Sequence, residues 1–193
     1  EVSKGFGGRT LFQDVNVVFS NGHNYGLTGP NGAGKSTFMK LLMRLEDTDT
    51  GTVSIPKRTG WLRQDHDAFD AYRAIDTVIM GNKRLWDAIV RKEEIYAKGD
   101  DITDDEGIEL GELEGIVAEE DGYEAEVNAA ILLAGLGVPS DAHERTVGEL
   151  PAGLKIRVML SQALFGDPEA LLLDEPTNGL DMEGIIWLED FLV

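Results

Sequence analysis

Residues 29–37, "GPNGAGKST", constrain this chain more strongly than any other part of its sequence. They match the pattern G-x-x-x-x-G-K-[ST] in full and lie between an expected strand, residues 25–28, and an apolar helix that begins near Phe38. The glycines let backbone N–H groups turn inward, so the loop and the N-terminus of the helix form a cradle for anions. The pattern therefore predicts a loop that binds nucleotide phosphates.

Individual side chains in this loop have distinct expected roles. Lys35 is expected to reach the β- and γ-phosphates of ATP, and Ser36 to place its hydroxyl on Mg²⁺. The residues expected to bind ATP are Gly29, Pro30, Asn31, Gly32, Ala33, Gly34, Lys35, Ser36 and Thr37. The alternative is a glycine-rich turn that happens to precede a helix, and the complete pattern in this context disfavours it.

An acidic pair follows a continuous apolar run late in the chain. Residues 170–173 are expected to form a parallel strand that is buried on both faces. Asp174 ends this strand, at the edge where an open parallel sheet places its ligand groups, and is expected to hold Mg²⁺ through a water molecule. Glu175 is expected to orient or deprotonate the attacking water. Alone, such a pair also fits a solvated turn, but beside the phosphate loop it predicts a hydrolytic site.

Composition limits the class of protein further. At 193 residues, of which 42% are hydrophobic, the chain can bury a core as one domain or as one domain with an insertion. The absence of cysteine excludes a disulfide scaffold and a thiolate nucleophile. No apolar run approaches the roughly 20 residues that span a bilayer, and no membrane partner is expected. A net charge of -19 gives no overall attraction to nucleic acid, so direct DNA binding is not expected.

The negative charge is concentrated in residues 99–126, which contain 13 Asp or Glu and no Lys or Arg. A block of like charges favours a solvated and mobile excursion from the domain. The alternative is an acidic surface that docks on a basic partner. His23, His66 and His143 lie far apart in the sequence and predict no metal site built from histidine.

Local patterns predict the order of elements. Alternating apolar residues at 15, 17 and 19, followed by an Asn-Gly turn at 21–22, predict a β-hairpin that runs into the phosphate loop. Residues 51–55 and 59–63 are further strand candidates. Helical spacing of apolar residues begins at Ile75, and a later helix that contains Val127 and Ile131 is expected to end near Gly135.

The stretch "GELPAGLKIRVML", residues 148–160, predicts a turn that starts a helix. The apolar stripe of this helix is formed by Ile156, Met159, Leu160, Ala163 and Leu164.

Together, "GPNGAGKST" and "LLLDEPTNGLD" resemble the ATP-binding cassette (ABC) domain. The resemblance implies an α/β fold: an ABC-type P-loop NTPase domain with an N-terminal antiparallel β-subdomain, a mostly parallel core sheet and a helical subdomain that carries an inserted arm. It implies that Gln64, in "LRQD", contacts Mg²⁺ and the attacking water. It also implies that Phe6, in "GFGG", stacks on adenine, with a core phenylalanine as the alternative. The loop that crosses to a partner domain, the D-loop, would consist of Asn178, Gly179, Leu180 and Asp181.

The turn at residues 150–154 occupies the place of the family's signature motif, usually Leu-Ser-Gly-Gly-Gln. Its residues here are Leu150, Pro151, Ala152, Gly153 and Leu154. A working signature turn binds the γ-phosphate of the nucleotide in the opposite site. It supplies a hydroxyl, backbone N–H groups and a helix N-terminus. Pro151 removes the hydroxyl and one N–H, and Leu154 replaces an amide. We therefore expect this turn to serve a weaker or mainly structural site.

The segments "DEPTN", "RQD" and "TVIMG" resemble the ABC-F proteins, and longer stretches such as "DTVIMGNKRLWDAI" and "DGYEAE" resemble the first nucleotide-binding domain of the YbiT-like branch. This implies a cytoplasmic ATPase that acts on the ribosome as a translation factor, with ATP and Mg²⁺ as cofactors and a second cassette on the same chain as its partner. The alternative is the nucleotide-binding subunit of an ABC transporter. The long acidic stretch before Leu150 favours the first reading.

The resemblance also implies boundaries. Residues 1–193 would be one cassette, with an inserted acidic helical arm at 86–125 and a helical subdomain that ends in the altered signature helix at 126–165. Because the chain stops at Val193, within the helix after the D-loop, we expect a C-terminally truncated cassette. Such a fragment is expected to bind ATP but to hydrolyse it weakly or not at all.

Overall fold

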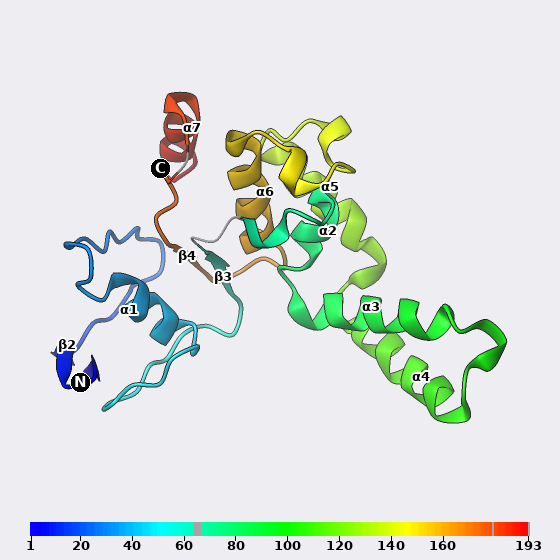
Figure 1. The fold of residues 1–193 in the computed structure, drawn as a ribbon, viewed down its shortest axis with the longest axis horizontal. Helices are drawn as coiled ribbons and strands as arrows, with labels where there is room; N and C mark the ends of the chain where they lie inside the picture. Colours follow the sequence, from blue (N-terminus) through cyan, green and yellow to red (C-terminus); the bar gives the residue numbers. More distant parts are fainter. Residues whose placement is uncertain (64–66, 179, 193) are drawn as a thin grey trace.

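The structure is a computed structural model, and it describes residues 1–63, 67–178 and 180–192 (Figure 1). Its strands are β1 (Val2–Phe6), β2 (Arg9–Val15), β3 (Thr59–Leu62) and β4 (Ala170–Leu173). Its α-helices are α1 (Lys35–Leu42), α2 (Ala74–Ile79), α3 (Lys83–Tyr96), α4 (Asp104–Glu119), α5 (Ala125–Gly135), α6 (Ala152–Leu164) and α7 (Met182–Leu192). Short 3₁₀ helices lie at Asp67–Phe69, Gly99–Asp101, Gly122–Glu124, Ser140–Ala142 and Val147–Glu149.

The N-terminal part contains an antiparallel β-hairpin, as the expected fold class requires. β1 pairs with β2, and Phe6 faces Arg9 across the tight turn at Gly7 and Gly8. The hairpin predicted around residues 21–22 is wrong, because residues 16–34 contain no strand and the strand expected at 25–28 is not formed. Alternation alone does not make a strand, since strand structure depends on a pairing partner and on burial of one face. Here Val17 and Tyr25 remain more than half exposed.

The core sheet is parallel, as predicted, and in the described residues it consists of β3 and β4. Leu62 faces Leu173 in the register of this pair. The strand predicted at residues 51–55 is not formed. The four residues of β4 are half-buried, whereas the sequence predicted burial on both faces. Parallel strands are buried on both faces inside larger sheets covered by helices, whereas among the described residues β4 pairs with one strand, β3.

In the helical part of the molecule, α6 packs against α2, α5 and β3 (Figure 1). Four of the five residues predicted for the α6 stripe are buried, and Leu164 is half-buried. Two glycines allow the backbone to approach α6 closely. A Cβ atom on Gly60 would lie 1.8 Å from the carbonyl oxygen of Ala163, and one on Gly81 would lie 2.0 Å from that of Gln162. Because only glycine fits there, β3 and the end of α2 lie directly against the C-terminal half of α6.

Helix α5 forms where the sequence predicted a helix, but it buries a different face. Val127 and Ile131, two of the apolar residues from which this helix was predicted, are 60% and 63% exposed. The buried residues are Ala125, Ala129 and Leu133. The spacing misidentified the face because this helix is apolar on nearly all sides, so its periodicity does not distinguish an inner face from an outer one.

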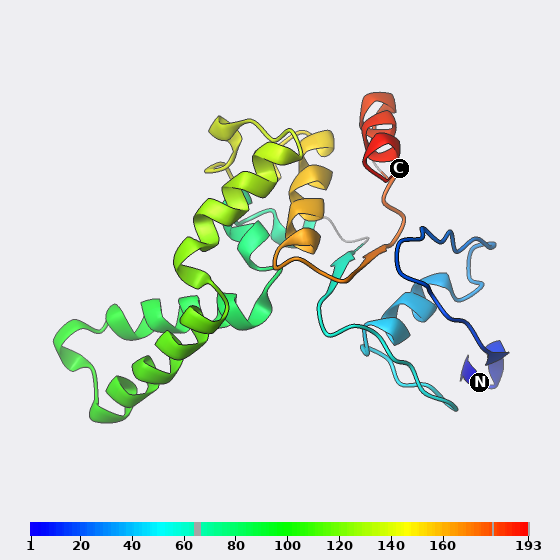
Figure 2. The same ribbon diagram turned by 180° about the vertical axis from the view of Figure 1, so that it is seen from behind.

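Helices α3 and α4 form a hairpin that projects away from the rest of the molecule (Figures 1 and 2). Most of the acidic block lies in α4 and is therefore an ordered helix rather than an irregular excursion. Its inward-facing carboxylates pair with bases on α3. Arg91 binds both oxygens of Glu109 at 2.7 and 2.9 Å, and Lys92 lies 2.6 Å from Glu114. The charges that suggested a mobile segment thus join two helices, while Glu112 and Asp105 remain exposed.

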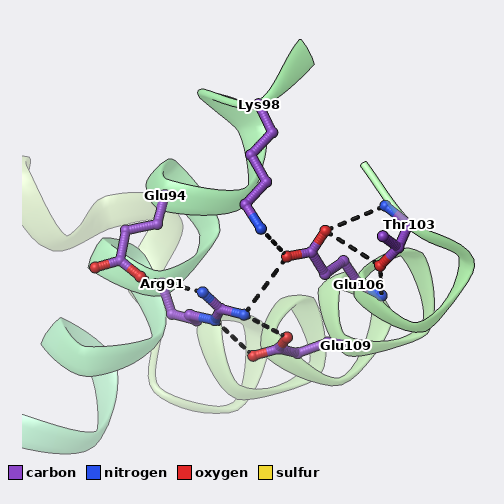
Figure 3. Close-up of polar contacts among 6 residues, drawn as sticks. All are labelled: Arg91, Glu94, Lys98, Thr103, Glu106 and Glu109. Atoms are coloured by element: carbon purple, nitrogen blue, oxygen red, sulfur yellow. Dashed lines mark hydrogen bonds and ion pairs between the residues drawn. The ribbon is translucent and has the colours of Figure 1, made fainter. Parts of the chain in front are cut away.

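Glu106 is the most buried acid of this hairpin (Figure 3). Its carboxylate accepts hydrogen bonds from Lys98 and from the backbone N–H of Thr103, whose side chain caps α4 in return. The hydrogen bond from Lys98, followed by the one from the Thr103 backbone, lowers the pKa of Glu106 from 4.5 to about 2. Arg91 adds a longer ion pair at 3.9 Å.

The charge of Glu106 should therefore contribute stability that depends on pH. Because its pKa is lowered on folding, the contribution is present above pH 4.5 and is lost as the pH falls toward about 2. We expect the Glu106→Gln variant to unfold at a lower temperature than the wild type at pH 7, with the difference shrinking through that window. Circular dichroism melts of the full-length protein would measure it. Glu112→Gln, at an exposed position of the same helix, is the control and should melt like the wild type; equal melting of all three proteins at pH 7 would contradict the assignment.

Candidate nucleotide-binding site

The phosphate loop closes into a turn that leads directly into α1. The N–H of Ala33 donates to the carbonyl of Pro30 at 3.1 Å, and Gly32 and Gly34 have φ values of 77° and 97°. These left-handed values favour glycine. The hydrogen-bond ladder of α1 starts where Phe38 N–H donates to Gly34 C=O, at 2.8 Å. The preceding N–H groups, at residues 35–37, belong to the first turn and have no intrahelical acceptor, so they can bind an anion.

Lys35 folds back over this loop. Its Nζ donates to the carbonyl oxygens of Gly29 at 3.0 Å and of Pro30 at 3.4 Å. The ammonium group is thereby held at the mouth of the anion cradle, at the N-terminus of α1. A phosphate placed at the helix N-terminus would meet this cation and the N–H groups together, and could replace the two carbonyl contacts with stronger charge-assisted bonds.

The two acids at the end of β4 differ in their surroundings. Asp174 is 9% exposed, and its N–H donates to the carbonyl of Leu62 at 3.1 Å, so the sheet fixes its position. Glu175 follows with φ of 50°, a left-handed value that residues other than glycine seldom adopt. Asn178 holds it there: its N–H donates to the carbonyl of Glu175 at 3.1 Å, and its Nδ2 donates to the carboxylate at 2.7 Å. The strained backbone and the amide clamp together set the direction of this carboxylate.

The remaining predicted residues are only partly described. Gln64 lies outside the described residues, as does Gly179; the parallel register nevertheless brings the end of β3 beside Asp174. Leu180 is half-buried, and Asp181 accepts the N–H of Gly184 at 2.8 Å near the start of α7. These positions of Leu180 and Asp181 do not test the predicted contact of the D-loop with a partner domain.

Phe6 is 50% exposed, so it is not a core phenylalanine. The ammonium of Lys4 lies 4.8 Å from the centre of its ring. The ring borders an open hollow of about 540 Å³ that also contains Arg9, Gln13 and Asp49. An exposed aromatic at such a hollow is compatible with stacking on a base, and this role stays a prediction.

The signature-like turn forms the start of α6, with Pro151 as the residue that precedes the helix. The carbonyl of Pro151 accepts from the N–H groups of Leu154 and Lys155 at 2.9 and 3.0 Å. Pro151, at the N-cap position, has no side-chain group that caps the helix, and the first turn contains no acid. Leu150 is buried, which anchors the turn, whereas Pro151 and Ala152 are exposed. The turn therefore presents a helix N-terminus without a hydroxyl group.

The phosphate loop, the two acids after β4 and the signature-like turn are each held by different neighbours in the structure. Gly34, at the end of the phosphate loop, lies against the β2 residue Leu11, where a Cβ atom would come within 3.4 Å. Asp174 and Glu175 are held by β3 and by Asn178, and the signature-like turn belongs to the helical part. The sequence did not identify the clamp of Asn178 on Glu175, although a side-chain amide three residues after the acid is a signal for a local turn.

Comparisons with known proteins define the class of this fold. A solved metal-chelate type ABC transporter in an inward-facing conformation matches it with a TM-score of 0.70 over 99% of this chain and 64% of that chain, at 21% identity. At this identity the likeness shows the fold alone, and the fold is that of an ABC domain. Among the described residues, no helix combines the length and the apolar character needed to cross a membrane.

The sequence comparisons show the family. The model of the ABC transporter family matches residues 12–178, and the chain belongs to this family. The ATP-binding protein YkpA of Bacillus subtilis is 48% identical over 100% of this chain, and YbiT of Escherichia coli O157:H7 is 46% identical over 99%. ABC transporter F family member 4 of Arabidopsis thaliana is 34% identical over 96%. The chain is thus an ATP-binding domain of the ABC-F type, and it spans 36% of the length of the two bacterial relatives.

Proposed function

We propose that the chain binds ATP with Mg²⁺ and hydrolyses it as the first of two cassettes in an ABC-F protein. The observation that carries the proposal is the geometry of the phosphate loop. Lys35, the first residue of α1, is held over the loop by the carbonyls of Gly29 and Pro30. This arrangement supplies positive charge and N–H donors at one point, as the phosphates of a nucleotide require.

The residues available for Mg²⁺ suit its chemistry. Mg²⁺ prefers oxygen ligands and keeps several of its water molecules. The hydroxyl of Ser36 and the buried carboxylate of Asp174 are such ligands, and Gln64 adds an amide oxygen. When bound, the metal would neutralise charge on the phosphates. We assign the orientation of the attacking water to Glu175, whose carboxylate is fixed by Asn178.

We place the second cassette in the same full-length protein because the chain covers 36% of its bacterial relatives. In this arrangement the turn at Pro151 faces the second nucleotide, and residues 126–165 form the helical subdomain that carries the turn. Lacking a hydroxyl, the turn binds the γ-phosphate weakly, so the two composite sites are unequal. The complete site of this chain uses the signature turn of the other cassette.

Restoring the signature sequence should therefore raise turnover. We expect the double variant Pro151→Ser, Ala152→Gly of the full-length protein to hydrolyse ATP several-fold faster than the wild type, since it regains a hydroxyl and a backbone N–H at the γ-phosphate. Steady-state phosphate release measures the change. Ser140→Ala, on a surface 3₁₀ helix, is the control. Unchanged turnover in the double variant would show that the sequence of this turn does not limit the rate of ATP hydrolysis.

We further propose that the protein acts on the ribosome in the cytoplasm and that residues 86–125, which include most of α3 and all of α4, are the arm that contacts it. The outward charge of α4 is acidic: Asp105 and Glu112 are exposed, whereas Arg91 and Lys92 of α3 are engaged with Glu109 and Glu114. Such a surface favours contact with basic protein over contact with the RNA backbone.

The test is co-sedimentation of the full-length Glu175→Gln variant with ribosomes. A variant that binds ATP but hydrolyses it slowly should accumulate in its ATP-bound form, and it should pellet with ribosomes in ATP but not in ADP. The matched control is Glu175→Gln combined with Lys35→Ala, which binds ATP far more weakly at this site and should pellet much less. Absence of ATP-dependent pelleting would refute the ribosomal role and leave the ATPase assignment standing. Pelleting with membranes instead would favour a transporter subunit.

A further inference from the structure

Lys4, in β1, is buried although it lies on a small two-stranded hairpin. The residue is 8% exposed, and no other lysine in the described part of the chain is buried. A lysine is rarely buried unless its ammonium has partners, because removing the charge from water costs free energy. The long side chain usually carries its charged end to the surface instead. The burial of Lys4 therefore calls for an explanation in its contacts.

Oxygen atoms from the segment after α1 hold the ammonium of Lys4. Its Nζ donates to the carbonyl of Asp47 at 2.6 Å, and the carboxylates of Glu46 and Asp49 lie 3.8 and 3.7 Å away. The carboxylate of Asp49 also accepts the N–H of Gly5, the next residue of β1, at 2.7 Å. This segment thus fixes both the ammonium and the strand backbone beside it.

The fixed ammonium lies over one face of the Phe6 ring, 4.8 Å from the ring centre. A cation over one face leaves the opposite face for another flat group. The ring is 50% exposed and borders the open hollow of about 540 Å³. Because the cation attracts the π-electrons of the ring, it also reduces the repulsion between the opposite face and the π-electrons of a stacked base. Lys4 therefore both supports the ring and prepares it for stacking.

The hairpin that carries this ring packs against the end of the phosphate loop. Gly34 lies against Leu11 of β2, where a Cβ atom would come within 3.4 Å. The rings of Phe12, in β2, and Phe38, in α1, meet edge to face with their centres 5.8 Å apart. Helix α1 starts at the loop, and the segment that follows the helix holds the ammonium of Lys4. The same helix is thus connected to the phosphate cradle at one end and to the support of the ring at the other.

We propose that Lys4 is a positioning residue for the base of the bound nucleotide. It holds the ring of Phe6 from one face, so that the base stacks on the other face while the phosphates occupy the loop. The inference rests on the proposed function, because it concerns the nucleotide bound at this site. A purely structural role for Lys4 would affect all ligands of the loop alike, whereas a positioning role affects only ligands that carry a base.

The test compares MgATP with the Mg²⁺ complex of inorganic tripolyphosphate, which has the phosphate chain of ATP without its base. Equilibrium titrations would use the full-length protein with its second cassette inactivated. Lys4→Met keeps an apolar side chain of similar length but removes the cation. We expect it to bind ATP about fivefold more weakly than the wild type and tripolyphosphate within about twofold. Unchanged binding of tripolyphosphate also shows that the variant is folded.

Two further variants control for charge. Lys4→Arg retains a cation and should bind ATP within about twofold of the wild type. Lys57→Met removes an exposed lysine shortly before β3, so it changes the net charge equally and should leave the binding of both ligands unaltered. Equal weakening of ATP and tripolyphosphate by Lys4→Met, or unchanged binding of ATP, would overturn the inference.

The ring itself supplies a second comparison. Phe6→Ala should weaken the binding of ATP about tenfold and spare tripolyphosphate, because stacking on an aromatic side chain contributes to the binding of a base. Adding Lys4→Met to Phe6→Ala should cause no further loss, since the lysine acts through the ring. A further fivefold loss would refute that route. A wild type that bound neither ligand would refute the proposed function, whereas one that bound both equally would refute only the base site.

Discussion

Replacing Glu175 by Gln in the full-length protein is expected to lower the turnover of ATP at this site by about 10²- to 10⁴-fold. The amide keeps the shape of the side chain and can still bond to Asn178, which holds the carboxylate at 2.7 Å in the wild type. It cannot accept a proton from water, so hydrolysis slows while nucleotide still binds. Single-turnover measurements of the first cassette, with the second cassette inactivated, would isolate the effect.

Glu169→Gln provides the matched control for this variant. Glu169 precedes β4 and forms an exposed ion pair with Arg58 at 3.7 Å, so its loss removes a carboxylate near the same strand without touching the site. Its turnover should match that of the wild type. Comparable losses in the two variants would show that removing an acid near β4, rather than the carboxylate of Glu175 in particular, is responsible.

The second large effect is expected for Lys35→Ala, which should weaken ATP binding about 100-fold. The ammonium of Lys35 is the cation held over the phosphate loop, and charge-assisted hydrogen bonds contribute about 1.5–3 kcal/mol each. Equilibrium binding of a fluorescent ATP analogue would measure the loss, with the second cassette inactivated so that one site is observed.

Lys40→Ala is the control for charge. Lys40 lies in the last turn of the same helix and is exposed, so the variant changes the net charge equally but leaves the loop intact. Its affinity for ATP should stay within about twofold of the wild type. If Lys35→Ala binds as tightly as Lys40→Ala, the loop does not bind phosphate through this lysine.

The sequence predicts best where a contiguous stretch encodes its own geometry. The phosphate loop, the strand that ends at Asp174 and the helix that starts after Pro151 each have their turn residues and their apolar spacing in one segment. The structure forms the turn, the strand and the helix where they were predicted. The parallel pairing of β3 with β4 could be expected because a buried apolar run that ends in ligand residues is typical of parallel sheets.

Features that depend on distant partners could not be predicted in the same way. The contact of Lys155 with Asp70 joins residues 85 positions apart, and neither residue has a local signal for it. The acidic block looked mobile because its bases lie outside it, on α3. The path of residues 16–34 depends on strand pairing, which alternation does not specify. The exposed side of α5 depends on which neighbours cover it, and its composition is uniform around the helix.

The two glycines that lie against α6 restrict which amino-acid substitutions this protein can tolerate. At Gly60 and Gly81 even the single methyl group of alanine would overlap a carbonyl oxygen of the helix, at 1.8 and 2.0 Å. These positions therefore tolerate no side chain unless the sheet separates from the helices. Substitutions elsewhere on β3 and α2 change the packing in proportion to the size of the new side chain. At these two positions even a change from glycine to alanine is severe. Both positions should remain glycine wherever this arrangement of strand and helix is retained, whatever happens to the signature-like turn at the other end of α6.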